Sequence, residues 1–152
     1  MALREQFTTE LKTAMKAGDA PRTSTLRMIL AKLKDTDIAA RPKGIAAVPD
    51  DEVMAMLRGM VKSRREAVAL YTQGNRPELA AKEEAEIAVI ESFLPRQMDD
   101  AALAAAVDAA VAETGAASVK DMGKVMAALK ARHGAALDMA RVGAVVRSKL
   151  GA

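Results

Sequence analysis

The chain has no cysteine, no tryptophan and a single histidine, His133. The lack of cysteine excludes disulfides, thiolate metal sites, iron–sulfur clusters and a cysteine nucleophile. One histidine cannot build a multi-histidine zinc site, so we expect no metal. Aromatic residues make up only 2% of the chain. Because base-stacking platforms need several aromatic rings, this composition excludes RNA recognition of that type.

Long apolar runs are also lacking. No stretch approaches the roughly 18 apolar residues that cross a bilayer. The first six residues are amphipathic and include Glu5, so they lack the apolar core of a signal peptide. The sequence therefore predicts no membrane contact and a cytoplasmic location, which the absence of cysteine also favours.

Helical periodicity dominates what is present. The 152 residues are 51% hydrophobic and 28% charged, which is typical of a folded protein. Apolar residues recur at helical spacing and strand alternation is absent. The sequence predicts an all-α protein with an N-terminal four-helix domain over 1–95 and a small C-terminal three-helix domain over 96–152. The expected helices cover about 2–17, 21–38, 49–71, 77–93, 100–113, 119–132 and a last segment after Asp138, with a poorly ordered linker over 39–48.

Three charged residues fall inside apolar stripes of the third and fourth expected helices. Arg64 lies at the centre of one stripe, and Glu83 and Glu86 lie within the other. The turn between these helices is about five residues long, so they are expected to be antiparallel neighbours. An unpaired buried charge would be costly, so we expect a structural ion pair of Arg64 with Glu83 or Glu86. A general acid/base pair of carboxylates is the functional alternative.

Basic residues form two candidate RNA-binding surfaces. Residues 120–152 carry seven basic and two acidic residues, whereas 96–119 carry one basic and four acidic. Such a segment suits phosphate contacts, although a plain solvated surface is the alternative. An interior Gly123 indicates a close approach, either of another helix or of an RNA backbone beside Lys124. The candidates are Lys120, Lys124, Lys130, Arg132, Arg141, Arg147 and Lys149, extended by an exposed helical face with Arg58, Lys62 and Arg65.

Several motifs occur in the order found in one known family. They include Asp121-Met122-Gly123-Lys124-Val125-Met126, then His133-Gly134 and Asp138, preceded by Arg64-Arg65-Glu66-Ala67, Glu83, Glu86 and Phe93-Leu94-Pro95. The chain resembles the YqeY family over nearly its whole length. Pro49 departs from the Ser or Thr expected there, which affects only the helix start.

The resemblance implies a small, helical, two-domain protein. The family's C-terminal three helices are similar to the tail of the tRNA-dependent amidotransferase B subunit, which contacts the tRNA body. The resemblance thus implies tRNA or another structured RNA as partner. It also implies the family label of carbon–nitrogen ligase with glutamine as amido-N-donor.

The residues themselves do not support that chemistry within this chain. Glutamine hydrolysis needs an activated nucleophile, and the five serines are scattered without an amidase loop. No glycine-rich phosphate loop is present. We therefore expect no catalytic residue, no cofactor and no DNA specificity, and an RNA-binding accessory role. A protein–protein adaptor and a component of a glutamine-dependent amidotransferase are the alternatives.

Overall fold

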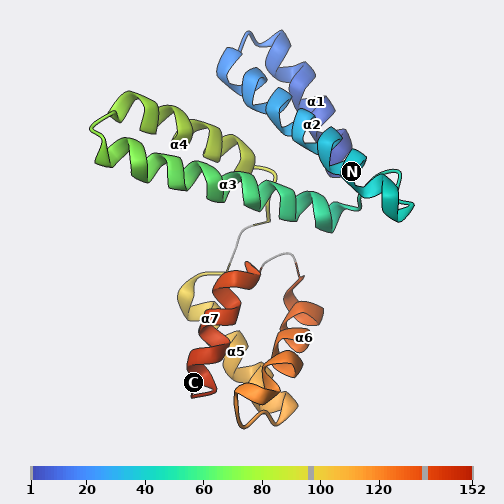
Figure 1. The fold of residues 1–152 in the computed structure, drawn as a ribbon, viewed down its shortest axis with the longest axis vertical. Coiled ribbons are helices and arrows are strands. Elements are labelled where there is room, and N and C mark those ends of the chain that lie inside the picture. The colour runs from blue at the N-terminus through green and yellow to red at the C-terminus, as the bar shows by residue number, and fades with distance from the viewer. Residues whose placement is uncertain (1, 96–97, 135–136, 152) are drawn as a thin grey trace. The chain divides into compact units, whose positions relative to one another are not determined.

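The computed structural model describes residues 2–95, 98–134 and 137–151, and most of them are helical. These residues form seven α-helices and two 3-10 helices and contain no strand, which confirms the all-α class (Figure 1). The elements are α1 (Leu3–Lys16), α2 (Ala20–Ala40), η1 (Arg41–Lys43), α3 (Asp50–Gln73), α4 (Pro77–Glu91), α5 (Asp100–Thr114), η2 (Val119–Asp121), α6 (Met122–His133) and α7 (Met139–Lys149).

The helices divide between two compact units, Met1–Leu94 and Pro95–Ala152. The first holds α1 to α4 and the second holds α5 to α7. Each unit has its own cluster of buried apolar side chains. Arg96 and Gln97, part of the break expected from sequence, lie outside the described residues.

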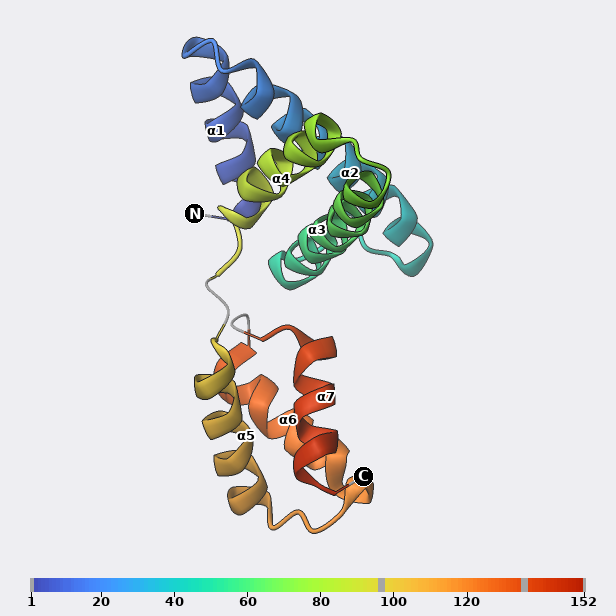
Figure 2. The same cartoon turned by 90° about the vertical axis from the view of Figure 1, so that its left-hand side faces the viewer.

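Two helical hairpins build the first unit. The α1–α2 hairpin turns at Gly18, whose φ of +69° suits glycine, and Asp19 then caps α2 through the Arg22 N–H. The α3–α4 hairpin turns at Gly74 and Asn75. Helix α2 packs against both α3 and α4, so the hairpins cross (Figures 1 and 2). The core between them includes the fully buried side chains of Phe7, Leu26, Ile29, Leu57 and Ile90.

The segment after α2 is more regular than the sequence indicated. Ala39 and Ala40 continue the helix, and η1 follows with Pro42 in its first turn, where a missing N–H is tolerated. The end of the segment is held by the Arg4 guanidinium. It donates to Val48 O at 2.8 Å, while the Asp37 carboxylate accepts the Val48 N–H at 2.9 Å. The expected linker over 39–48 is therefore helical up to Lys43, and only residues 44–49 lack helix.

Three short helices build the second unit. Helices α5, α6 and α7 each contact the other two around buried Leu103, Val107, Val125, Leu129 and Val146 (Figure 2). The Asp99 carboxylate caps α5 by accepting the Ala102 N–H at 2.7 Å. Before α6, the Ser118 side chain makes no capping bond, whereas Asp121 Oδ2 accepts the Ala117 N–H at 3.0 Å.

Within the described ranges, no single helix has the length and apolar character to cross a bilayer. One pair of segments has the length and apolar character of a membrane span only when the two are taken together across a bend of 92°, namely Asp100–Thr114 and Val119–His133.

Candidate nucleic-acid interface

A charged cluster lies at the interface of α3 and α4. Arg64 Nε lies 3.0 Å from Glu86 Oε2 and 3.9 Å from Glu83 Oε2. The side chains of Arg64 and Glu86 are each only 15% exposed. Arg64 Nη1 also donates to Met60 O at 3.4 Å, and Nη2 contacts Met28 Sδ of α2 at 3.7 Å. The geometry joins three helices through one guanidinium, which is the arrangement of a structural ion cluster.

The basic residues Arg58, Lys62 and Arg65 of α3 differ in their exposure. Lys62 is exposed, whereas Arg58 is half-buried. Arg65 is exposed and forms an ion pair with Glu91 of α4. The sequence predicted that all three share one exposed face, as candidates for RNA binding or as a solvated surface. The partial burial of Arg58 and the ion pair of Arg65 with Glu91 both depend on tertiary packing, which the sequence pattern does not show.

Carboxylates associated with α5 hold three of the seven C-terminal cations. Arg132 of α6 donates to Glu113 at 2.6 Å, and Lys149 of α7 lies 3.1 Å from Asp108. Arg141 donates to Met98 O at 2.7 Å and pairs with Asp100. The acidic segment and the basic segment of this unit therefore neutralise each other in part.

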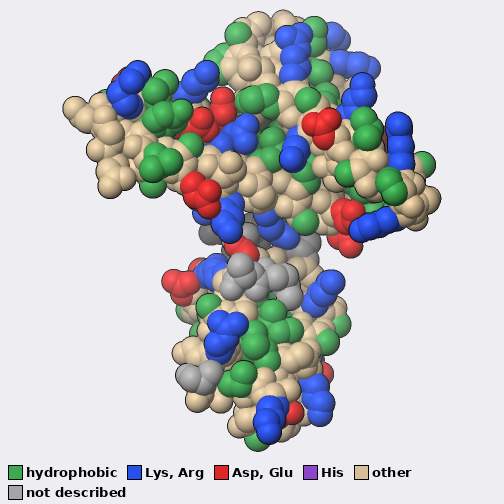
Figure 3. Space-filling model, in the orientation of Figure 1, with side chains coloured by type: hydrophobic (Ala, Val, Ile, Leu, Met, Phe, Trp, Pro, Cys, Tyr) green, Lys and Arg blue, Asp and Glu red, His purple; other side chains and the backbone are tan. Residues whose placement is uncertain are grey.

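Four of the seven cations remain exposed and form no ion pair with a described residue: Lys120, Lys124, Lys130 and Arg147. On α6, Lys124 and Lys130 lie about 120° apart around the helix axis. In the space-filling view, basic side chains of this unit are separated by other surface on the visible face (Figure 3). The exposed cations thus form a dispersed surface, with Lys120 and Lys124 at adjacent turns.

Gly123 lies between Lys120 and Lys124 and is exposed. A Cβ at this position would meet no described atom within 4 Å. A close helix crossing, which the sequence analysis considered, does not occur there. Gly143 of α7 is buried, in contrast to Gly123. A Cβ at Gly143 would lie 3.6 Å from Met122 Cε, which is an ordinary van der Waals contact. Nearby, the Ala117 N–H lowers the pKa of Asp121, and Lys124 contributes in the same direction.

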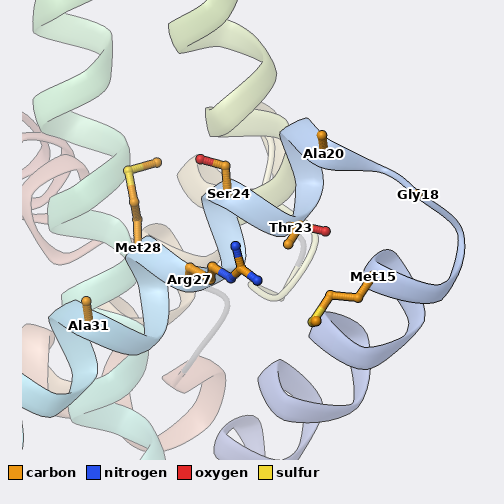
Figure 4. Close-up of a pocket in the computed structure, with 8 residues that line it drawn as sticks. All are labelled: Met15, Gly18, Ala20, Thr23, Ser24, Arg27, Met28 and Ala31. Atoms are coloured by element: carbon orange, nitrogen blue, oxygen red, sulfur yellow. The ribbon is translucent and has the colours of Figure 1, made fainter.

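The α1–α2 hairpin carries a basic surface that the sequence analysis overlooked. Residues 12–34 include six Lys or Arg and only one acid, Asp19. In Figure 3 the basic side chains gather over this hairpin. The same hairpin has a hollow of about 580 Å³ beside Met15 and Arg27 (Figure 4). The charge count was available in the sequence, but the hollow depends on how α1 and α2 pack.

No group of three or more His, Asp or Glu side chains among the described residues is arranged to hold a metal ion.

Curated relatives align with about half of the chain. An uncharacterised protein of Schizosaccharomyces pombe is 28% identical over 86 residues, which is 57% of this chain and 67% of that protein. The "Altered inheritance of mitochondria protein 41, mitochondrial" of Vanderwaltozyma polyspora is 28% identical over 85 residues. Its namesake from Eremothecium gossypii is 30% identical over 85 residues. These alignments cover 56% of this chain and 44% and 45% of the two relatives.

The names of these relatives correct one expectation. Four relatives are named as mitochondrial proteins, which contradicts the expectation of a cytoplasmic location. The cytoplasmic prediction rested on the amphipathic character of the first six residues and on the lack of cysteine, and neither feature separates the cytoplasm from an organelle interior.

One family model spans both units. The model described as "Yqey-like protein" matches residues 4–150, from the first turn of α1 to the end of α7. The match therefore includes the Arg64 cluster, the exposed C-terminal cations and the α1–α2 hairpin. The chain belongs to the Yqey-like protein family.

Proposed function

We propose that this protein is an accessory factor that binds tRNA or another structured RNA and has no catalytic site of its own. The observation that carries the proposal is the pair Lys120 and Lys124, which are exposed, form no ion pair with a described residue and lie on either side of the open Gly123. Lysines at this spacing reach successive phosphates, and a glycine lets a ligand backbone approach closely. The resemblance of this unit to the amidotransferase B-subunit tail supports the same partner.

The binding mode follows from the aromatic inventory. Phe7 is fully buried and packs edge-on against Phe93, with ring centroids 4.9 Å apart. Tyr71 lies on α3, so all three rings belong to the unit Met1–Leu94 and not to the C-terminal unit. Without rings for stacking, the C-terminal unit binds RNA by charge and shape. Any amidotransferase chemistry would then reside in partner subunits, and this chain would contribute RNA affinity to them.

The salt dependence of binding to bulk tRNA tests the proposal. Each cation that neutralises a phosphate adds about −0.9 to the slope of log K against log salt, by the value for duplex DNA. Four unpaired cations give a slope of about −3.6, or about 150-fold weaker binding from 50 to 200 mM salt. All seven cations would give about −6.3. A slope near the larger value contradicts the assignment to the four exposed residues.

Lys124→Glu is the diagnostic variant. It should weaken binding and reduce the steepness of the slope by about 1, because one phosphate contact is lost. Lys43→Glu is the matched control, since Lys43 is also exposed but lies on η1 of the other unit. Absence of binding at 50 mM salt, or equal effects of the two variants, would refute the proposal.

A second candidate function is a protein–protein adaptor. It is favoured by Met15, whose side chain is large, apolar and 54% exposed on the α1–α2 hairpin. A catalytic component of a glutamine-dependent amidotransferase has no comparable support. Glutaminase activity of the purified chain would contradict both the accessory role and the adaptor role.

A further inference from the structure

The hollow on the α1–α2 hairpin has an apolar wall on both helices. We call it the hairpin groove. It is open to solvent and is walled by Met15 of α1 and by Ala20, Ser24, Arg27, Met28 and Ala31 of α2. Its volume is about 580 Å³. Methionine is unbranched and polarisable, so such walls adapt to apolar side chains of different shape.

A single cation lies within this apolar surface. Figure 4 shows Arg27 extending from α2 across the hollow toward Met15, while Met28 points away toward α3. Arg27 is exposed and forms no ion pair with any residue that the structure describes. A bound partner would therefore gain by placing a carboxylate over the Arg27 guanidinium.

Two lysines near the groove carry the same sign of charge as Arg27. Lys34 lies seven residues after Arg27, at about 20° around the axis of α2, so it continues the groove face. Lys12 lies three residues before Met15, at about 60° around the axis of α1. Both lysines are exposed. Ile38, 43% exposed, extends the apolar line by a further turn.

We propose that the hairpin groove docks an acidic amphipathic helix of a partner protein. Such a helix presents apolar residues at a spacing of three and four, which fit beside Met15 and Ala31. Flanking Asp or Glu residues then meet Arg27, Lys12 and Lys34. Charge complementarity selects an acidic partner, and the apolar wall selects one with an apolar face.

RNA fits this groove less well than a peptide does. Phosphates would use the lysines but would leave the Met15 thioether and the alanines without apolar contacts. No aromatic side chain lines the hollow on which a base could stack. The groove is therefore a protein-docking surface, separate from the cations of α6.

Methionine methyl NMR on the full chain tests the docking directly. The probe is a synthetic helical peptide of about 18 residues, with leucines at positions i, i+3, i+4 and i+7 and glutamates beside them. Two comparison peptides replace either the glutamates with lysine or the leucines with glutamine. We expect the acidic amphipathic peptide alone to shift the Met15 methyl resonance while leaving that of Met126 of α6 in place.

Charge reversals on one helix locate the site. Arg27→Glu should weaken binding of the acidic peptide about tenfold, because the substitution puts like charges opposite each other. Lys32→Glu is the matched control, since Lys32 is exposed on α2 but about 140° from Arg27 around the axis. It should change the affinity by about twofold or less. Circular dichroism verifies that both variants keep their helix content.

Three results would overturn the proposal. One is an unmoved Met15 resonance at about 1 mM peptide. Another is an equal response to all three peptides or to both variants. The last is a Met15 shift induced by bulk tRNA and abolished by Arg27→Glu, which would assign the groove to RNA. None of these results bears on Lys124→Glu, so the proposals for the two units fail separately.

Discussion

Replacing Arg64 with Met should destabilise the unit that contains α3 and α4. The guanidinium is held 3.0 Å from Glu86 and 3.9 Å from Glu83. Methionine keeps much of the side-chain volume and the helix propensity, so the main loss is charge and hydrogen bonding. The two carboxylates, only 22% and 15% exposed, would then face each other without a cation.

The magnitude follows from how far the pair is buried. Breaking a fully buried ion pair from one side costs about 3–5 kcal/mol. This cluster retains some contact with water, so we expect a loss of about 2–4 kcal/mol in the free energy of unfolding. The adjacent Arg65→Met is the matched control. Its pair with Glu91 is 66% and 44% exposed, and such surface pairs contribute about 0–1 kcal/mol.

Urea unfolding measures the difference. Tyr71 is the single tyrosine of the chain and lies in α3, so its fluorescence reports on that unit, while circular dichroism follows the whole chain. The double variant Arg64→Met/Glu86→Met should be more stable than Arg64→Met, because it removes one stranded carboxylate. Equal losses for Arg64→Met and Arg65→Met would refute the reasoning.

Two further substitutions test other features of the structure. The hydrogen bond from Arg4 and the Val48 N–H lower the pKa of Asp37 from 3.8 to about 2. The ionised carboxylate therefore stabilises the fold at pH values above its ordinary pKa, and this contribution is lost as the pH falls through about 2. Asp37→Asn should lower the melting temperature at pH 7, and the difference from wild type should shrink below about pH 4; a constant difference would contradict this. Gly123→Ala should raise stability by up to about 1 kcal/mol, since a Cβ meets open space, while weakening tRNA binding. Unchanged tRNA affinity would show that no ligand backbone approaches Gly123.

Much of the helical framework could be predicted from periodicity and breakers. Gly18, Gly74 and Gly115 mark three helix ends, and Asp99 caps α5. Helical spacing also puts Arg64 and Glu86 on facing stripes, although they are 22 residues apart. A short connection between two amphipathic helices leaves little choice in how they pack, so local pattern carries tertiary information there.

Other features depend on packing that local pattern does not encode. The acids of α5 hold Arg132, Arg141 and Lys149 only because α6 and α7 both pack on α5. The charge count of residues 120–152 alone predicts a basic surface whose cations are not paired with acids. The hairpin groove likewise requires two helices to meet at a particular distance. Its charge was visible in the sequence, but its shape was not.

The two apolar cores have a consequence for how this protein melts. Among the described residues, the cluster around Phe7 and Leu26 shares no member with the cluster around Leu129 and Val146. Because each unit has an apolar core of its own, we expect the two units to unfold in separate cooperative transitions. A single midpoint from a heating curve would average two equilibria. A substitution in one unit would then appear diluted in the whole-chain signal by the helices of the other.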